Sequence, residues 1–262
     1  MLKLHVIGSG SKGNAALIED AATGNVLAVD CGLCARDYLA GLSAAGVDPA
    51  QISGLLITHE HTDHTKGLGV VLRALRKKGA QVPVYVDEPA ARNSRDVMAL
   101  VGDFSFRRLE QGKRQNINGI DVLPFATSHD AASSCGFRFE ATGDALGYLT
   151  DSGIVTPQAH DALQQVRILA LESNHDPEML RVGPYPYPLK RRVGDTNGHL
   201  SNQQAADELR ELMWSGLEQV VAMHISQNNN TYDLPEAILR EALGDHAAHV
   251  QSAHQSRMIS VC

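Results

Sequence analysis

The sequence predicts an α/β fold in which β-sheets are covered on their outer faces by helices. The first observation is a run of short apolar segments, separated by glycine-rich turns, at the start of the chain. The second is that segments with helical spacing follow these strands, and the third is that strands followed by helices occur again in the second half. Sheets that bury one face against helices are the expected outcome of this order. The length of 262 residues suits one large domain or two small ones.

The first half of the chain begins with three predicted strands. Residues 2–7, 14–18 and 25–29 are each bounded by turn residues, which is typical of an antiparallel meander. A helix is expected at 35–45 and a buried strand at 53–57. The later elements are expected as a helix from residue 68, a strand at 82–86, a helix at 88–101, strands at 104–109, 120–123, 125–128, 136–140, 146–150 and 166–171, a helix from Ser201 to Trp214, a strand at 219–224 and a helix near Asp233.

Composition and charge exclude several classes of protein. No apolar run is long enough to span a membrane, and the stretch before Gly8 is too short for a signal peptide, so we expect a cytoplasmic protein. Four cysteines without a secretory signal indicate reduced thiols, and Cys31 and Cys34 are expected to be two small buried residues. The net charge of −7 disfavours nonspecific coating of nucleic acid, although it leaves room for a local basic region.

The segment Thr58–His64 concentrates groups that bind metal ions. It follows a predicted strand and contains His59, His61, Asp63 and His64. Histidines two residues apart point the same way on extended backbone but not on a helix, so His59 and His61 suit one ion. Asp63 and His64 lie on the turn that follows and suit a second position a few ångströms away, as two-metal hydrolytic sites require.

Three further polar residues, His129, Asp151 and His224, each follow a predicted strand. A lone histidine at a strand end is more often structural than a ligand. A site that already holds His59 and His61 needs another ligand, however, and two divalent ions favour a bridging carboxylate. We therefore expect these residues to complete the site.

A basic segment lies in the second half. Lys190, Arg191 and Arg192 precede His199, which stands just before the predicted helix cap at Ser201. A basic triplet is usually a solvated face, but a helix start is a natural place to bind an anion. We therefore expect this region to contact phosphate.

Two other motifs leave alternatives open. His175, after the strand at 166–171, suits a ligand, a proton donor or a turn residue equally well. The glycine-rich segment at 8–14 lacks the features of a nucleotide-binding loop, and it suits either a hairpin turn or a set of backbone donors for an anion.

Taken together, the segment Thr58–His64, with Asp30 before it and His129, Asp151 and His224 after it in order, resembles the metallo-β-lactamase superfamily. The resemblance spans most of the chain. It implies a single domain over residues 1–262 with a four-layer αββα sandwich, in which two sheets lie face to face, helices lie outside and the metal site lies at one edge.

The resemblance also implies roles for individual residues. A first ion would be held by His59, His61 and His129, and a second by Asp63, His64 and His224. Asp151 would bridge both ions, and Asp30 would anchor the ligands from behind, which fixes the orientation of a histidine. The β-lactamases proper often have a cysteine near the bridging position, so the aspartate here points away from antibiotic hydrolysis.

Within the superfamily, residues 8–14, 172–176, 198–202 and 224–229 resemble the bacterial YycJ/WalJ branch. That resemblance implies a 5′→3′ exonuclease acting on DNA. Two divalent ions, which could be zinc, manganese, iron or nickel, would turn a bridging water into a hydroxide that attacks phosphorus. Asp63 would act at the reacting centre, and His199 or His175 would protonate the leaving group. The residues expected to position the phosphodiester are Lys190, Arg191, Arg192, Ser201 and Asn202.

Two alternatives belong to other classes. One is a hydrolase of small acyl compounds on the same fold, either a glyoxalase II-type thioesterase or a lactonase. The other is a non-catalytic protein that binds metal without an open coordination position. The ligand count disfavours the second alternative.

Overall fold

The computed structural model describes residues 1–262, and its strands form two seven-stranded sheets. The first sheet has the order β14-β1-β2-β3-β4-β5-β6, with β1 (Leu2–Gly8), β2 (Ala15–Asp20), β3 (Asn25–Val29), β4 (Ile52–Leu56), β5 (Val84–Asp87), β6 (Phe106–Leu109) and β14 (Ile259–Val261). The second has the order β13-β12-β11-β10-β9-β8-β7, with β7 (Gln115–Ile117), β8 (Ile120–Ala126), β9 (Cys135–Ala141), β10 (Asp144–Leu149), β11 (Ile168–Glu172), β12 (Gln219–Met223) and β13 (His249–Ser252).

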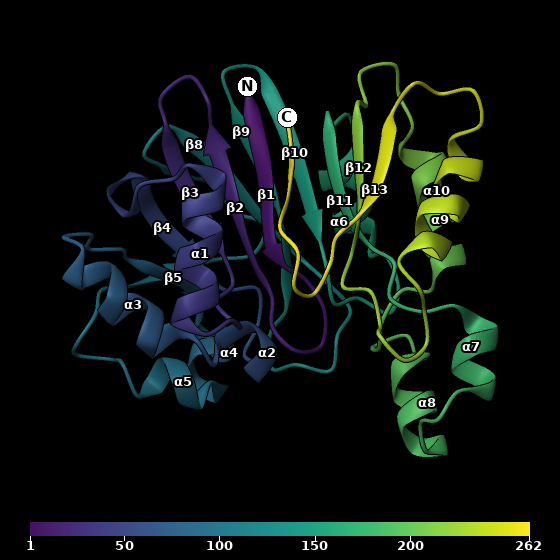
Figure 1. Ribbon diagram of the computed structural model, residues 1–262, viewed down its shortest axis with the longest axis horizontal. Coiled ribbons are helices and arrows are strands. Elements are labelled where there is room, and N and C mark those ends of the chain that lie inside the picture. Colours follow the sequence, from purple (N-terminus) through teal and green to yellow (C-terminus); the bar gives the residue numbers. More distant parts are fainter.

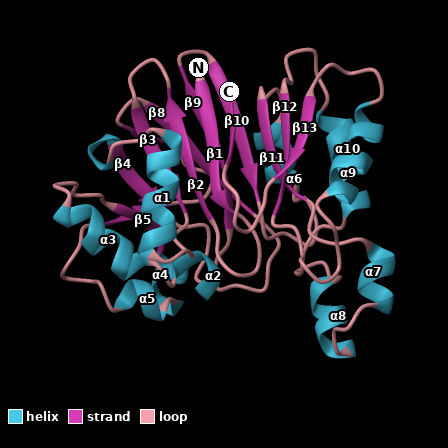
Figure 2. Ribbon diagram, in the orientation of Figure 1, coloured by secondary structure: helices cyan, strands magenta, loops and turns pink.

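The helices divide between the two sheets (Figures 1 and 2). On the side of the first sheet lie α1 (Ala35–Ala45), α2 (Thr62–Thr65), α3 (Leu68–Lys77), α4 (Glu88–Asn93) and α5 (Arg95–Met98). The second half contributes α6 (Pro157–Leu163), α7 (Pro177–Val182), α8 (Tyr187–Val193), α9 (Asn202–Leu212) and α10 (Asp233–Leu243). Of these, α7 and α8 extend away from the sheets, at the lower right of Figure 1. No helix has the length and apolar character needed to cross a bilayer.

Three layers of apolar side chains hold the elements together. The central layer lies between the sheets and includes Ile18 from the first sheet and Phe137 from the second. A second layer packs the helices α1 and α3 on the first sheet and includes Leu42 and Leu17. A third packs α9 and α10 on the second sheet and includes Leu209 and Val220. The architecture is therefore the predicted αββα sandwich.

Strand direction decides where functional residues gather. The strands β3 to β6 run parallel to one another, and so do β10 to β13. Since parallel strands place their carboxyl ends at one edge of a sheet, the loops that follow them share one edge of the sandwich. The antiparallel meander predicted for β1, β2 and β3 is confirmed.

Several predicted elements were wrong in detail. The helix expected at 88–101 is broken, because the hydroxyl of Ser94 caps a new helix through the backbone N–H of Val97. The strands expected at 120–123 and 125–128 are one strand, β8, which accommodates Pro124 where it extends past β7. Cys31 is buried as expected, but Cys34 is exposed.

The stretch at 184–188 contains three prolines, a composition that usually breaks regular structure. Instead it starts a helix, because Pro186 is the N-cap residue of α8 and a second proline occupies its first turn. Proline suits that position, where a missing N–H costs no helical hydrogen bond. The stretch therefore builds the arm formed by α7 and α8.

Candidate metal centre

The residues of the Thr58–His64 segment reach one point at the edge of the sandwich. Residues 57–61 are outside helix and strand, and His61 has extended backbone angles, with φ −60° and ψ 148°, as the N-cap of α2. Asp63 and His64 then follow on α2. His59 and His61 therefore lie on non-helical backbone, as predicted, and the turn carries Asp63 and His64 to a second position.

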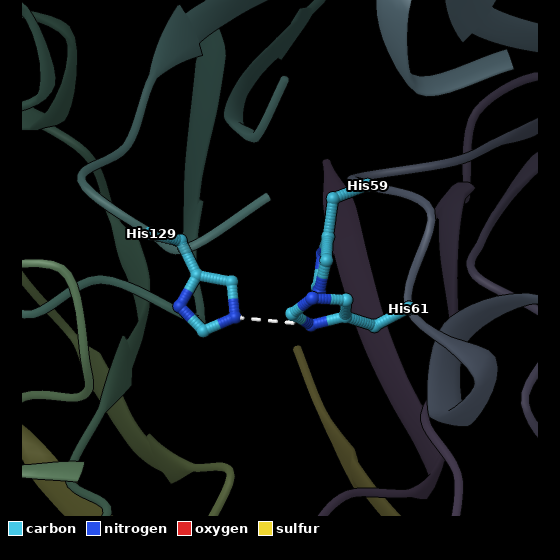
Figure 3. Close-up of side chains that lie close together, drawn as sticks. All are labelled: His59, His61 and His129. Atoms are coloured by element: carbon cyan, nitrogen blue, oxygen red, sulfur yellow. Dashed lines mark hydrogen bonds between the residues drawn. The ribbon is translucent and has the colours of Figure 1, made fainter. Parts of the chain in front are cut away.

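Figure 3 shows His59 and His61, which follow β4 of the first sheet, close to His129, which follows β8 of the second sheet. The ring centroid of His59 lies 4.6 Å from that of His61 and 5.0 Å from that of His129. Nε2 of His129 lies 3.2 Å from Nδ1 of His61. One nitrogen from each ring can reach a common point, so the three imidazoles can hold one ion.

Asp63, His64 and His224 form a second group of the same kind. Oδ2 of Asp63 lies 3.5 Å from Nε2 of His64 and 3.6 Å from Nε2 of His224. Asp151 lies between the two groups, with one oxygen 3.3 Å from Nε2 of His64 and the other 3.8 Å from Nε2 of His129. Its position suits a carboxylate shared by two ions.

The ring nitrogens that face away from this centre are fixed by neighbours. Nδ1 of His64 lies 2.7 Å from Oδ2 of Asp30, and the same carboxylate accepts hydrogen bonds from the backbone N–H and hydroxyl of Thr58. Nδ1 of His129 lies 3.0 Å from the carbonyl oxygen of Gly198. Such partners select the tautomer that leaves the other nitrogen free for a metal. Asp30 thus lies behind His64, as the family resemblance implied.

Glu172 is the main residue of this region that the sequence did not single out as functional. It is fully buried at the end of β11, and its Oε1 lies 2.8 Å from Nδ1 of His199 and 3.1 Å from Nδ1 of His224. Its Oε2 accepts hydrogen bonds from the backbone N–H groups of Ser152 and Leu200. A glutamate at the end of a buried strand was the available signal, because burying a carboxylate requires partners.

Three residues of the centre have left-handed backbone conformations. They are Asp30, Asp151 and His224, with φ of 60°, 56° and 53°. Each directly follows a strand of the parallel runs or lies within two residues of it. Such conformations are uncommon for residues other than glycine and cluster at functional sites, where surrounding contacts hold them. The strained turns aim all three side chains back toward the edge of the sandwich.

Burial and charge set different protonation states among the ligands when no metal is bound. Burial alone would lower the pKa of His224, but Asp151 and Asp63 raise it to about 10, so a metal would displace a proton from this ring. Burial lowers the pKa of His59 well below its usual range, so its imidazole is neutral at neutral pH. Burial alone would raise the pKa of Asp63, but the nearby charge of His64 brings it well below the ordinary value. Glu172 behaves likewise, since His199 and His224 outweigh burial and lower its pKa to about 2.

The predicted proton donors differ in their access to the centre. His199 is 19% exposed and lines the cavity above Asp151, whose oxygen is 3.7 Å from Nδ1. His175 is buried, does not line the cavity, and has its pKa lowered to about 4 by burial. A histidine that is neutral and enclosed at neutral pH does not suit the role of proton donor. The structure therefore favours His199 and disfavours His175.

The residues predicted to contact phosphate also differ in whether they line the cavity. Arg192 lines the cavity, whereas Lys190 and Arg191 lie on α8 outside it, because neighbouring residues of a helix face different ways. The hydroxyl of Ser201 forms the predicted capping box with Gln204. Asn202 is fully buried, and its amide bonds to Ser173 and Asn230. Ser201 and Asn202 thus build the wall of the site rather than its open surface.

The glycine-rich turn at 8–14 proves to be a structural support. Its N–H groups bond within the protein, for example from Gly10 to the side chain of Asn14 and from Lys12 to the side chain of Gln255. The side chain of Asn14 in turn lies 3.0 Å from Nε2 of His64. The turn therefore braces the ligands, and the interpretation of its backbone as an anion cradle is not supported.

Buried nitrogens without partners test whether the centre suits a metal. Nε2 of His59 and Nε2 of His224 are buried and have no hydrogen-bond partner. Unpaired buried polar atoms are costly, and both point to where an ion would complete their coordination. Imidazole and carboxylate donors are those that zinc and related divalent ions accept. The residues present therefore fit divalent metal ions.

Comparison with known proteins gives consistent results. The family described as the beta-lactamase superfamily domain matches residues 25–225. The chain is 30% identical over 254 residues to the exodeoxyribonuclease YycJ of Bacillus anthracis, covering 97% of this chain and 94% of that protein. It is 32% identical over 235 residues to the exodeoxyribonuclease WalJ of Streptococcus pneumoniae, covering 88% and 84%. Among solved structures, YhfI of Bacillus subtilis, a metallo-beta-lactamase fold protein, superimposes with a TM-score of 0.74 at 16% identity over 99% of each chain.

Proposed function

We propose, from the premise that the chain belongs to the metallo-β-lactamase superfamily in the branch of YycJ and WalJ, that it is an exonuclease that shortens DNA. The chain is a metal-dependent hydrolase by its family and relatives. What we add is the substrate, DNA attacked from an end, and the use of two ions. The names of the two relatives, both exodeoxyribonucleases, support the substrate.

The observation that carries the two-ion proposal is the pair of ligand groups that meet at Asp151. Each group offers three side-chain ligands within reach of one point, and one carboxylate faces both. When bound, two divalent ions supply a water of lowered pKa and neutralise charge that develops on a phosphodiester. That chemistry suits a substrate whose reacting centre is anionic.

The remaining groups of the cavity suit the steps around that chemistry. Arg192 would bind the phosphodiester, since a guanidinium pairs well with phosphate oxygens. His199 would give a proton to the leaving oxygen, and the carboxylate of Glu172 orients it through Nδ1. Val193 and Leu189 line the same wall and restrict water there.

The charge of the arm that carries Arg192 supports a nucleic-acid substrate. Residues 177–193 contain four basic side chains and one acidic side chain, in a chain of net charge −7. A local basic region within an acidic protein attracts the phosphate backbone without coating it nonspecifically. Lys190 and Arg191 would contribute at this longer range, although neither lines the cavity.

The proposal is tested with purified protein and three substrates, which are labelled duplex DNA, labelled single-stranded DNA and an acyl thioester. Each is incubated with manganese, zinc or magnesium. Progressive shortening of DNA from an end, with no thioester hydrolysis, is the expected result. Thioester hydrolysis without shortening of DNA would instead support a small-molecule hydrolase, and bound metal with no turnover of any ester would support a binding protein.

A further inference from the structure

The cavity of the metal centre has two rims that are joined by an ion pair. One rim is the loop that follows β8 and carries His129 and Asp130, and the other is α8, which carries Arg192. Nε of Arg192 donates a hydrogen bond to Oδ2 of Asp130, so a salt bridge spans from one rim to the other. The contact joins residues 62 positions apart in the sequence.

The space beneath this bridge is narrow. The cavity has a volume of about 250 Å³, below the roughly 300–1,000 Å³ of pockets that enclose a drug-sized ligand. Its floor is nearly closed to solvent, since the side chains of His129, Asp151 and His224 are only 2–3% exposed. A phosphodiester must therefore reach deep between the rims to meet the ligands.

The end of a DNA strand and the interior of a DNA strand need different amounts of room in such a cavity. A phosphodiester inside a continuous strand has nucleotides on both sides, and both must leave between the rims. A phosphodiester at an end needs only one exit. We propose that the bridge between Arg192 and Asp130 selects strand ends over continuous strands, which rests on the proposed nuclease function.

The geometry of the bridge lets Arg192 hold the rim and a phosphate together. A guanidinium carries five N–H donors, and Asp130 takes only the one on Nε. The donors on the two terminal nitrogens stay available for a phosphate oxygen. The bridge therefore does not need to open when an end binds, whereas a continuous strand requires it to part.

The test compares linear single-stranded DNA with a closed circle of the same sequence, using the wild-type protein loaded with manganese. The measured quantity is the ratio of the cleavage rate on circles to that on linear strands. A partly exposed ion pair holds a closed state over an open one by up to about fivefold, so Asp130→Ala and Arg192→Gln should each raise this ratio by up to about fivefold. The ratio corrects for any loss of phosphate affinity in Arg192→Gln.

Arg191→Ala is the matched control, because it removes one positive charge from the same helix without touching the bridge. Its ratio should equal that of the wild type. Metal content is measured for every variant, since Asp130 adjoins His129, and if Asp130→Ala loses metal then Arg192→Gln decides alone. An unchanged ratio in Arg192→Gln overturns the inference, whereas a wild type that leaves linear DNA intact overturns the proposed function.

Discussion

Replacing Glu172 with glutamine tests how much the buried carboxylate behind the centre contributes. All four of its partners approach with N–H groups once His199 and His224 present their Nδ1 atoms as donors. The two histidines donate to Oε1, and the backbone N–H groups of Ser152 and Leu200 donate to Oε2. A glutamine has only one oxygen, so its NH2 group must face one of these pairs of donors, whichever way it turns.

The size of the effect follows from that mismatch. Two hydrogen bonds to a charged group are lost, at about 1.5–3 kcal/mol each, so the free energy of unfolding should fall by about 3–6 kcal/mol. If the NH2 group faces the histidines, His224 also loses the partner that orients it. Loss of such a partner lowers metal affinity by about 10–100-fold.

The assay is urea unfolding of the metal-free protein, together with competition for zinc against a chelator. Glu60→Gln is the control, because the side chain of Glu60 accepts one hydrogen bond, from the backbone N–H of Ala132, which an amide oxygen can still accept. A Glu172→Gln protein as stable as Glu60→Gln, with unchanged zinc affinity, would falsify the role given to this carboxylate.

Three further predictions concern single residues. His61→Ala should abolish metal-dependent hydrolysis and leave the urea midpoint of the metal-free protein nearly unchanged, because His61 is a half-buried ligand at a loop; full activity in the folded variant would contradict its role. Asp30→Asn should lower the free energy of unfolding by about 1.5–3 kcal/mol, since asparagine tolerates the left-handed backbone but its NH2 group must face either Thr58 or His64, and urea titration measures this. His175 is neutral in the folded state with a pKa of about 4 but titrates near 6.5 when unfolded, so the unfolded state binds more protons between these values and stability should fall by about 3 kcal/mol from pH 6.5 to pH 4. His175→Gln should flatten that part of the stability curve, and an unchanged slope would show that another group is responsible.

Apolar periodicity and turn residues predicted most strands and helices because they are local signals, whereas the αββα order of layers came from the family resemblance. The ligands of the Thr58–His64 segment could be predicted for the same reason, because four of them occur within six positions. His129, Asp151 and His224 could be added because each follows a recognisable strand. A ligand that follows the end of a strand can therefore be predicted from the sequence, because the strand itself is a local pattern.

The features that were missed depend on contacts between distant segments. Glu172 meets His199 and His224, which lie 27 and 52 residues further on, and no spacing rule connects them. The bridge between Asp130 and Arg192 depends on how α8 is placed, and the sequence pattern did not predict a helix there. Burial of Ser201 and Asn202 likewise follows from packing of α9, which periodicity alone does not describe.

The two ligand groups share one architectural trait. His59 and His61 come from the side of the first sheet and His129 from the second, while Asp63 and His64 come from the first and His224 from the second. Each bound ion would therefore act as a cross-link between the two halves of the sandwich. Ligand present at a hundred times its dissociation constant adds about 2.7 kcal/mol to stability, so chelation should loosen this edge first and make it the place where unfolding and proteolysis begin.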